Sequence, residues 1–226
     1  MLKSISYTIS LIAFVTLFSC RPQPLKDRDT ISTETQESNM PAVAPAKLSP
    51  FEFVSWCRDE NNNLHKSKEL GELTFSLQYK PCEYIVCLEQ KKEHIEKSQL
   101  YKELEELEGL DYYDLRITLA SGQGELLKYG LSSVQEYNER VNYFAFRMQQ
   151  DLKLITGKDT VDCKLFHFER SYDVSPQAVF LLGFPAATST DKERTFFYED
   201  NIFKKGIIKF TFTPKELNQI PKLKTL

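Results

Sequence analysis

The chain has 226 residues, of which 41% are hydrophobic, and it carries 29 Lys and Arg against 32 Asp and Glu, a formal charge of −3 at pH 7. This length and apolar content suit one domain with a sizeable core. The mildly acidic balance argues against a nucleic-acid partner, because phosphate backbones select clustered Lys and Arg.

The N-terminus has the features of an export signal. Lys3 precedes a largely apolar run from Ile5 to Phe18, which has the length of a secretory h-region. A membrane-spanning helix needs about 20 apolar residues, so this run is too short to span a bilayer. We therefore expect residues 1–19 to be removed as a signal peptide.

Leu17-Phe18-Ser19-Cys20 resembles the lipobox of bacterial lipoproteins. The resemblance covers only the first twenty residues, and it implies cleavage before Cys20, a diacylglyceryl group on the Cys20 thiol and acylation of the new amino terminus. Two or more acyl chains hold a protein stably on a membrane. Arg21 rather than Asp follows the cysteine, which in enteric lipoproteins implies the outer membrane. The alternative is a signal peptide or membrane-embedded helix in which Cys20 is incidental.

Residues 20–49 are predicted to form a tether. They contain four prolines among Ser, Thr, Gln, Glu and Asp, and no aromatic residue. Such a composition cannot bury enough apolar surface to offset the entropy of ordering. As a coil, the segment has a root-mean-square span of roughly 30 Å. The remaining residues, 50–226, are predicted to form one globular domain.

Four cysteines remain in that domain: Cys57, Cys82, Cys87 and Cys163. An even number in an oxidising compartment permits disulfides, but buried free thiols are equally compatible with the sequence. Cys82 and Cys87 are poorly spaced for pairing with each other, whether on a strand or on a helix. Both interpretations stay open.

The N-terminal half of the domain is predicted to contain both element types. Residues 51–57 and 71–79 alternate as short strands do, with a polar loop between them, while residues 82–89 are ambiguous between strand and helix. Residues 90–108 predict a charged amphipathic helix. Residues 115–120 and 125–129 flank the turn-rich segment 121–124, which predicts a β-hairpin.

The C-terminal half begins with a capping box, Ser133-x-x-Glu136, followed by apolar residues at helical spacing up to Gly157, which predicts a long core helix. Strands are predicted at 164–170, 178–184, 195–199 and 206–213. A second capping box, Thr213 to Glu216 with Pro214 at the first helical position, predicts a short final helix. The whole pattern indicates an α+β fold with a largely antiparallel sheet.

The sequence offers no established catalytic or metal motif. Asp59-x-Asn61-x-Asn63 lacks the glycine of a calcium loop, and the histidines and cysteines lack the spacings of zinc ligands, so neither a metal nor a cofactor is expected. Cys163 and His167, four apart on a predicted strand, lie roughly 13 Å from each other, too far for a dyad. A hydrolase using scattered residues would have to be tested first at His167 and Glu169.

Two aromatic clusters are candidates for recognition. Tyr112-Tyr113 and Phe196-Phe197-Tyr198 place neighbours on opposite faces of predicted strands, so one member of each cluster is either covered by another layer or exposed. If exposed, Tyr112, Tyr113, Phe196 and Tyr198 would form a binding surface.

These observations lead to one main functional hypothesis and two alternatives. The main one is a non-enzymatic, lipid-anchored envelope protein that binds another envelope or surface protein. The first alternative is a glycan-binding or small-ligand-binding lipoprotein, which a concave pocket lined by those aromatics would favour. The second is a hydrolase of unknown type.

Overall fold

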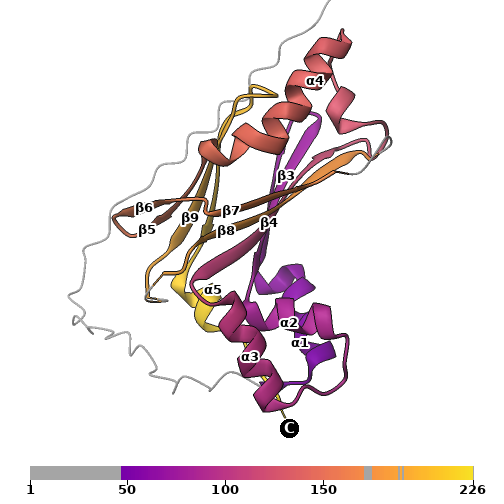
Figure 1. The fold of residues 1–226 in the computed structure, drawn as a ribbon. Helices are drawn as coiled ribbons and strands as arrows, with labels where there is room; N and C mark the ends of the chain where they lie inside the picture. Colours follow the sequence, from indigo (N-terminus) through magenta and orange to yellow (C-terminus); the bar gives the residue numbers. More distant parts are fainter. Residues whose placement is uncertain (1–46, 171–174, 188, 190, 226) are drawn as a thin grey trace, which may run out of the picture. The chain divides into compact units, whose positions relative to one another are not determined.

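The computed structural model describes residues 47–170, 175–187, 189 and 191–225. They belong to a single compact unit with five α-helices and three sheets among the described residues, so the predicted α+β class is confirmed (Figure 1). The predicted signal peptide, Cys20 and nearly all of the tether lie outside the described residues. Within those ranges, no helix is long and apolar enough to cross a bilayer.

The larger sheet has five antiparallel strands. Its central strand β4 pairs with β3 on one side and with β8 on the other, and β2 and β7 form the edges. In spatial order the strands are β2 (His65–Leu70), β3 (Leu73–Lys80), β4 (Leu110–Leu119), β8 (Gln177–Pro185) and β7 (Leu165–Glu169).

The second sheet has four antiparallel strands, in the order β10 (Gly206–Phe212), β9 (Arg194–Asp200), β5 (Leu152–Thr156) and β6 (Asp159–Asp162). A third sheet consists of only two short parallel strands, β1 (Lys47–Leu48) and β11 (Lys222–Leu223). This pair holds the start of the described chain beside its end. Residues 47–49, which the sequence assigns to the tether, therefore lie beside the folded domain, with Lys47 and Leu48 paired to β11.

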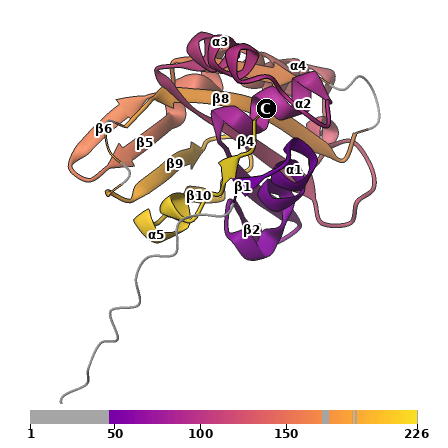
Figure 2. The same cartoon turned by 90° about the horizontal axis from the view of Figure 1, so that it is seen from below.

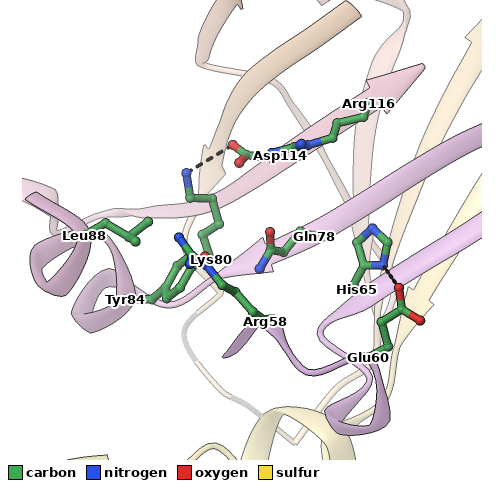
Figure 3. A pocket seen from close by; sticks show the side chains of 9 residues that line it. All are labelled: Arg58, Glu60, His65, Gln78, Lys80, Tyr84, Leu88, Asp114 and Arg116. Carbon is green, nitrogen blue, oxygen red and sulfur yellow. Dashed lines mark hydrogen bonds and ion pairs between the residues drawn. The ribbon is translucent and has the colours of Figure 1, made fainter. Parts of the chain in front are cut away.

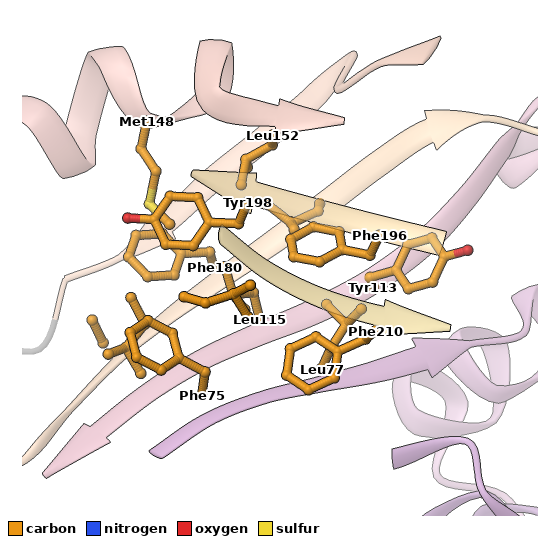
Figure 4. Packing of buried hydrophobic residues seen from close by; sticks show 14 of the residues in the cluster. Phe75, Leu77, Tyr113, Leu115, Met148, Leu152, Phe180, Phe196, Tyr198 and Phe210 are labelled. Carbon is orange, nitrogen blue, oxygen red and sulfur yellow. The ribbon is translucent and has the colours of Figure 1, made fainter. Parts of the chain in front are cut away.

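The two larger sheets pack face to face, and the main core lies between them (Figure 4). Alternate side chains of each strand point inward, as strand geometry requires. Phe75 of β3 lies 6.4 Å from Tyr198 of β9, and Tyr113 of β4 lies 5.8 Å from Phe212 of β10, measured between ring centroids. The single sheet that the sequence predicts is thus replaced by two layers joined through aromatic residues.

Helices close the two ends of these layers (Figure 1). At one end, α1 (Pro50–Arg58), α2 (Cys82–Gln90) and α3 (Lys97–Leu107) surround a second apolar cluster. At the other end lie α4 (Val134–Asn142), a π-helical turn (Tyr143–Arg147) and a 3₁₀ turn (Met148–Asp151). The short helix α5 (Pro214–Asn218) and the 3₁₀ turns Glu60–Asn62 and Leu126–Lys128 complete the elements. Both clusters form between residues 48 and 223, so the domain contains its own cores.

Residues 51–57 form helix α1, so the predicted strand is wrong. Ser49 and Glu52 make a reciprocal capping box, and Pro50 occupies the first helical turn. These start signals outweigh the short alternation of apolar residues. The predicted polar loop that follows contains the edge strand β2, and the ambiguous segment after Pro81 is the helix α2.

The predicted hairpin around residues 121–124 is also wrong. β4 pairs with β3 and β8 instead, and residues 126–128 form a 3₁₀ turn. The buried guanidinium of Arg140 holds that turn by donating to the carbonyl oxygens of Leu126, Leu127 and Tyr129. The carbonyl groups of this segment are therefore satisfied by a charged side chain from α4 rather than by pairing with a neighbouring strand.

The predicted core helix is shorter than its apolar period suggested. Its Ser133–Glu136 capping box is present, but the α-helix ends at Asn142, and Leu152 begins β5. The charged helix begins at Lys97 rather than at residue 90. The four C-terminal strands and the Thr213–Glu216 capping box are confirmed.

All four cysteines of the domain are free thiols in the structure, and three of them are fully buried. Burial raises the pKa of Cys57 and Cys87 to about 12, and that of Cys82 and Cys163 to about 11. The sequence left disulfides and free, buried thiols open, and the structure shows free thiols.

A buried ion pair joins the two large sheets. The Asp111 carboxylate of β4 lies 2.8 Å from the Arg194 guanidinium of β9, and both side chains are less than a tenth exposed. Tyr79 of β3 donates its hydroxyl to Asp111 and accepts from Arg194, while the amide of Ala187 also donates to Asp111. Tyr79 contacts both apolar clusters, so the network lies where they meet.

Replacing Asp111 by Ala should destabilise the protein by about 3–5 kcal/mol, because Arg194 would be left charged and unpaired in the interior. The double variant Asp111→Leu/Arg194→Met removes both charges and should recover much of that loss. Urea unfolding followed by circular dichroism measures both. Equal stability of Asp111→Ala and the native protein would show that the pair does not hold the sheets.

A second ion pair fastens the edge strand to the C-terminal segment. The Lys66 ammonium of β2 lies 2.6 Å from the carboxylate of Glu216 in α5, and neither side chain is more than a quarter exposed. Partial burial raises the pKa of Glu216, but its bonds with Lys66 and Thr213 prevail and lower it below the usual value.

Glu216→Gln should cost about 1 kcal/mol of stability at pH 7, since it removes an ion pair and weakens a helix cap. A depressed carboxyl pKa contributes stability above the unfolded-state value near 4.5, and this is lost as the pH falls through the folded-state value. The difference between the two proteins should therefore close in acid. Thermal unfolding at pH 7 and pH 3 tests this, and a difference that stays constant with pH would contradict it.

Candidate functional site

The side of the five-stranded sheet that faces away from the core carries mainly polar side chains. Strand alternation puts every second residue of β3 and β4 on this side. In β3 from Thr74 and in β4 from Asp114 these residues are half-buried or exposed, whereas Tyr112, on the same side, is buried. We call this surface the outer face. Its members are His65, Ser67, Glu69, Thr74, Ser76, Gln78, Lys80, Asp114, Arg116, Thr118, Gln177, Val179, Leu181, His167 and Glu169.

A pocket of about 420 Å³ hollows the outer face where α1 and α2 meet the sheet. Figure 3 shows side chains from both helices and from three strands arranged around it. It is lined by Arg58, Glu60, His65, Gln78, Lys80, Tyr84, Leu88, Asp114 and Arg116. Leu88 is the one aliphatic residue in this set, so the lining is overwhelmingly polar.

Short contacts position several of these groups. Lys80 and Asp114 form an ion pair at 3.2 Å, and both are largely covered. The Arg58 Nε donates to the Tyr84 hydroxyl at 3.3 Å, which directs the guanidinium along the pocket wall. The Gln78 amide donates to the Cys57 carbonyl at 3.2 Å, so β3 is tied to the end of α1.

The pocket carries an excess of positive charge. Arg58, Lys80 and Arg116 face two carboxylates, Glu60 and Asp114. Lys80 is paired, whereas neither arginine has a carboxylate partner within the described residues. Arginine guanidinium groups bind carboxylates in a planar, two-pronged geometry, so two unpaired ones are suited to an acidic group brought by a ligand.

A second hollow lies at the opposite edge of the same face. It measures about 430 Å³ and is lined by His167, Glu169, Arg170, Ser175, Gln177 and Val179. The strand register places Leu181 between Asp114 and His167, and Val179 between Arg116 and Glu169. Leu181 and Val179 therefore lie between the polar residues of the two hollows on one continuous surface, and Val179 also lines the second hollow.

The four aromatic candidates do not form a recognition surface. Tyr113, Phe196 and Tyr198 are fully buried and Tyr112 is 6% exposed. The first three point into the space between the sheets, because the four-stranded sheet supplies the second cover that the sequence left open. Tyr112 lies across from Lys80 at the start of α2. The four side chains therefore lack the exposure on which their predicted binding role depended.

His167 and Glu169, the residues first named for a hydrolase, both lie on the outer face and line the second hollow. Cys163 is buried and donates its thiol to the Leu165 carbonyl, while His167 is exposed, so the structure does not bring this pair together. Ser175 in the same hollow accepts from the amide of Gln177. Across the described ranges, no group of three His, Cys, Asp or Glu residues could hold a metal ion.

The pocket residues Arg58, Gln78, Lys80, Asp114 and Arg116 were not singled out from the sequence. A usable signal exists for the strand members, since Asp114, Arg116 and Thr118 alternate with apolar residues that fill the core. Alternation identifies a row of residues that faces solvent. It does not reveal that the end of a helix will lie beside this row and form a pocket with it.

No protein-family model, no curated protein and no solved structure matches this chain.

Proposed function

We propose that this protein is a lipid-anchored bacterial envelope protein that acts without catalysis, by binding another envelope or surface protein through the outer face. Export through residues 1–19 and lipidation at Cys20 would place it on a membrane, with the outer membrane the expected one. The observation that carries the binding role is the outer face itself, a broad polar surface hollowed at both edges.

The size of the outer face supports a protein partner. Five strands spaced about 4.8 Å apart give a width near 24 Å, and about eight residues of strand give a length near 26 Å. The resulting area of roughly 600 Å² approaches the ~800 Å² that each partner buries in a typical specific complex. A small ligand would use only one of the two hollows.

The chemistry of the outer face also supports a protein partner. Small-molecule pockets are mostly apolar, whereas Leu88 is the lone aliphatic residue of the larger hollow. Protein interfaces are enriched in arginine, and Arg58 and Arg116 lack carboxylate partners in the described part of the chain. An acidic side chain of the partner would supply the carboxylate that these two arginines lack. The glycan alternative depended on aromatics that are now found in the core.

The test is a mild-detergent pull-down of the tagged, lipidated protein from its own cells, with mass spectrometry of proteins recovered in near-equal amount. A stoichiometric partner should be captured by the native protein and lost with Arg58→Glu/Arg116→Glu, because the reversed charges repel the acidic group. The matched control Lys158→Glu/Lys209→Glu makes the same charge change on two exposed residues, one in the turn between β5 and β6 and one in β10, and should retain the partner.

Undiminished capture by the folded Arg58→Glu/Arg116→Glu variant would reject the outer face as the binding surface. Recovery of no partner at all would reject the protein-binding function, and soluble glycans would then be screened.

The anchor is tested separately. Cys20→Ala should release the protein from membranes, since no acyl chain can then be attached. Cell fractionation and washing at high salt measure this. A mutant that stays in the washed membrane pellet would contradict lipid anchoring at Cys20.

A further inference from the structure

The end of the domain where the described chain begins is rich in exposed lysines. The β1–β11 pairing sets Lys47 directly opposite Lys222. Lys224 lies two residues further along the chain, and its amide donates to the Leu48 carbonyl at 2.7 Å. All three lysine side chains are exposed. Figure 2 looks onto this end and shows the C-terminus lying among α1, α2 and α3.

Two large aromatic side chains are exposed on the helices at this end. Phe51, in the first turn of α1, is 54% exposed, and Tyr101 of α3 is 61% exposed. Tyr101 lines a groove of about 370 Å³ together with Lys97, Lys222 and Leu223. The Lys97 ammonium lies 5.7 Å from the centre of the Tyr101 ring. Exposed apolar groups of this size, set among charges, mark an interaction surface.

Close to the β1–β11 pair, the acidic residues are few and partly engaged. Glu52 accepts from Ser49 in the cap of α1, and Lys224 lies close enough to lower the pKa of Glu52 further. Glu83 lines the same groove as Tyr101. Lys47, Lys97, Lys222 and Lys224 outnumber these two carboxylates around the β1–β11 pair and its groove. Glu105 and Glu108 lie on the other side of Tyr101, where they line a separate hollow with it.

We propose that this surface, formed by Lys47, Phe51, Lys97, Tyr101, Lys222 and Lys224 and here called the entry end, rests on a bilayer that contains anionic lipids. The lysines meet the headgroup phosphates, and the two aromatic rings lie at the level of the headgroups. Mixed basic and aromatic surfaces bind membranes in this way.

The position of the entry end in the chain argues for a membrane as its occupant. Residues 20–46 are all that separate Lys47 from Cys20, the proposed site of lipidation. A coil of that length keeps the domain within roughly 30 Å of its anchor. Each lysine near an anionic surface strengthens binding about fivefold. Because confinement supplies an effective concentration on the order of millimolar, even such a weak contact becomes occupied.

Membrane contact at the entry end would orient the outer face. The strands β3, β4 and β8 extend between the helices at this end and α4 (Figure 1). With the entry end on the lipid, these strands rise from the bilayer and the outer face is turned sideways, open to a partner in the same membrane.

Binding can be measured on the mature chain, residues 20–226, made without its signal peptide so that it carries no lipid. This chain keeps both apolar clusters of the domain. Trp56 of α1 is the single tryptophan, so energy transfer from Trp56 to a dansyl-labelled lipid reports approach of this end. Transfer is expected with vesicles of mixed phosphatidylcholine and phosphatidylglycerol, and little with phosphatidylcholine alone or at high salt.

Lys47→Gln/Lys222→Gln/Lys224→Gln should weaken binding to the mixed vesicles by roughly 100-fold, from the fivefold effect of each charge. Phe51→Ser/Tyr101→Ser should weaken it at unchanged charge. The control Lys158→Gln/Lys204→Gln/Lys209→Gln removes three lysines elsewhere and should bind as the native chain does. Equal binding by the entry-end variants, or equal transfer to neutral vesicles, would overturn the proposal.

This result is independent of the partner proposal, which is tested in detergent without a bilayer. The vesicle assay also uses no lipid on Cys20. Failure at the entry end can therefore be told apart from failure of the outer face or of the anchor.

Discussion

The buried contact between Asp111 and Arg194 is the constraint on which the arrangement of this domain depends. It joins a strand of one sheet to a strand of the other, and Tyr79 connects it to the apolar cluster under α1, α2 and α3. Apolar packing between the sheets is non-directional, whereas an ion pair requires one geometry. The pair thus favours one placement of the layers, and with it the position of the helices that wall the pocket.

The period of two along β3 and β4 links stability to the candidate site. Phe75, Leu77, Leu115 and Ile117 fill the core, and the residues between them form the outer face. A shift of one residue in register would exchange the two sets and expose the core. The same packing that stabilises the sheet therefore fixes Gln78, Asp114 and Arg116 in one spatial row.

The sequence predicted the elements whose signals are local and strong. The capping boxes at Ser133 and Thr213 and the four C-terminal strands were found, because caps and alternation act within a few residues. At residues 51–57 the short alternation of apolar residues predicts a strand, but the capping box of Ser49 and Glu52 begins a helix there. Arg140, which secures a 3₁₀ turn from α4, acts over a distance that local patterns do not report.

The candidate site was harder to predict than the fold. Aromatic pairs on strands are compatible with both an exposed surface and a two-layer core, and only the second sheet decides between them for Tyr113 and Tyr198. Arg58 comes from α1 and Arg116 from β4, so their meeting at one pocket follows from tertiary packing. Polar residues on an exposed row are common, and their function depends on what lies beside them.

The raised thiol pKa values have a consequence for biogenesis. Thiol–disulfide exchange requires the thiolate, and at neutral pH a thiol with a pKa near 11 is ionised in roughly one molecule in ten thousand. Once the chain has folded around Cys57, Cys87 and Cys163, these thiols exchange only slowly with disulfides. If the chain is exported as proposed above, its own folding would protect these cysteines from mispairing.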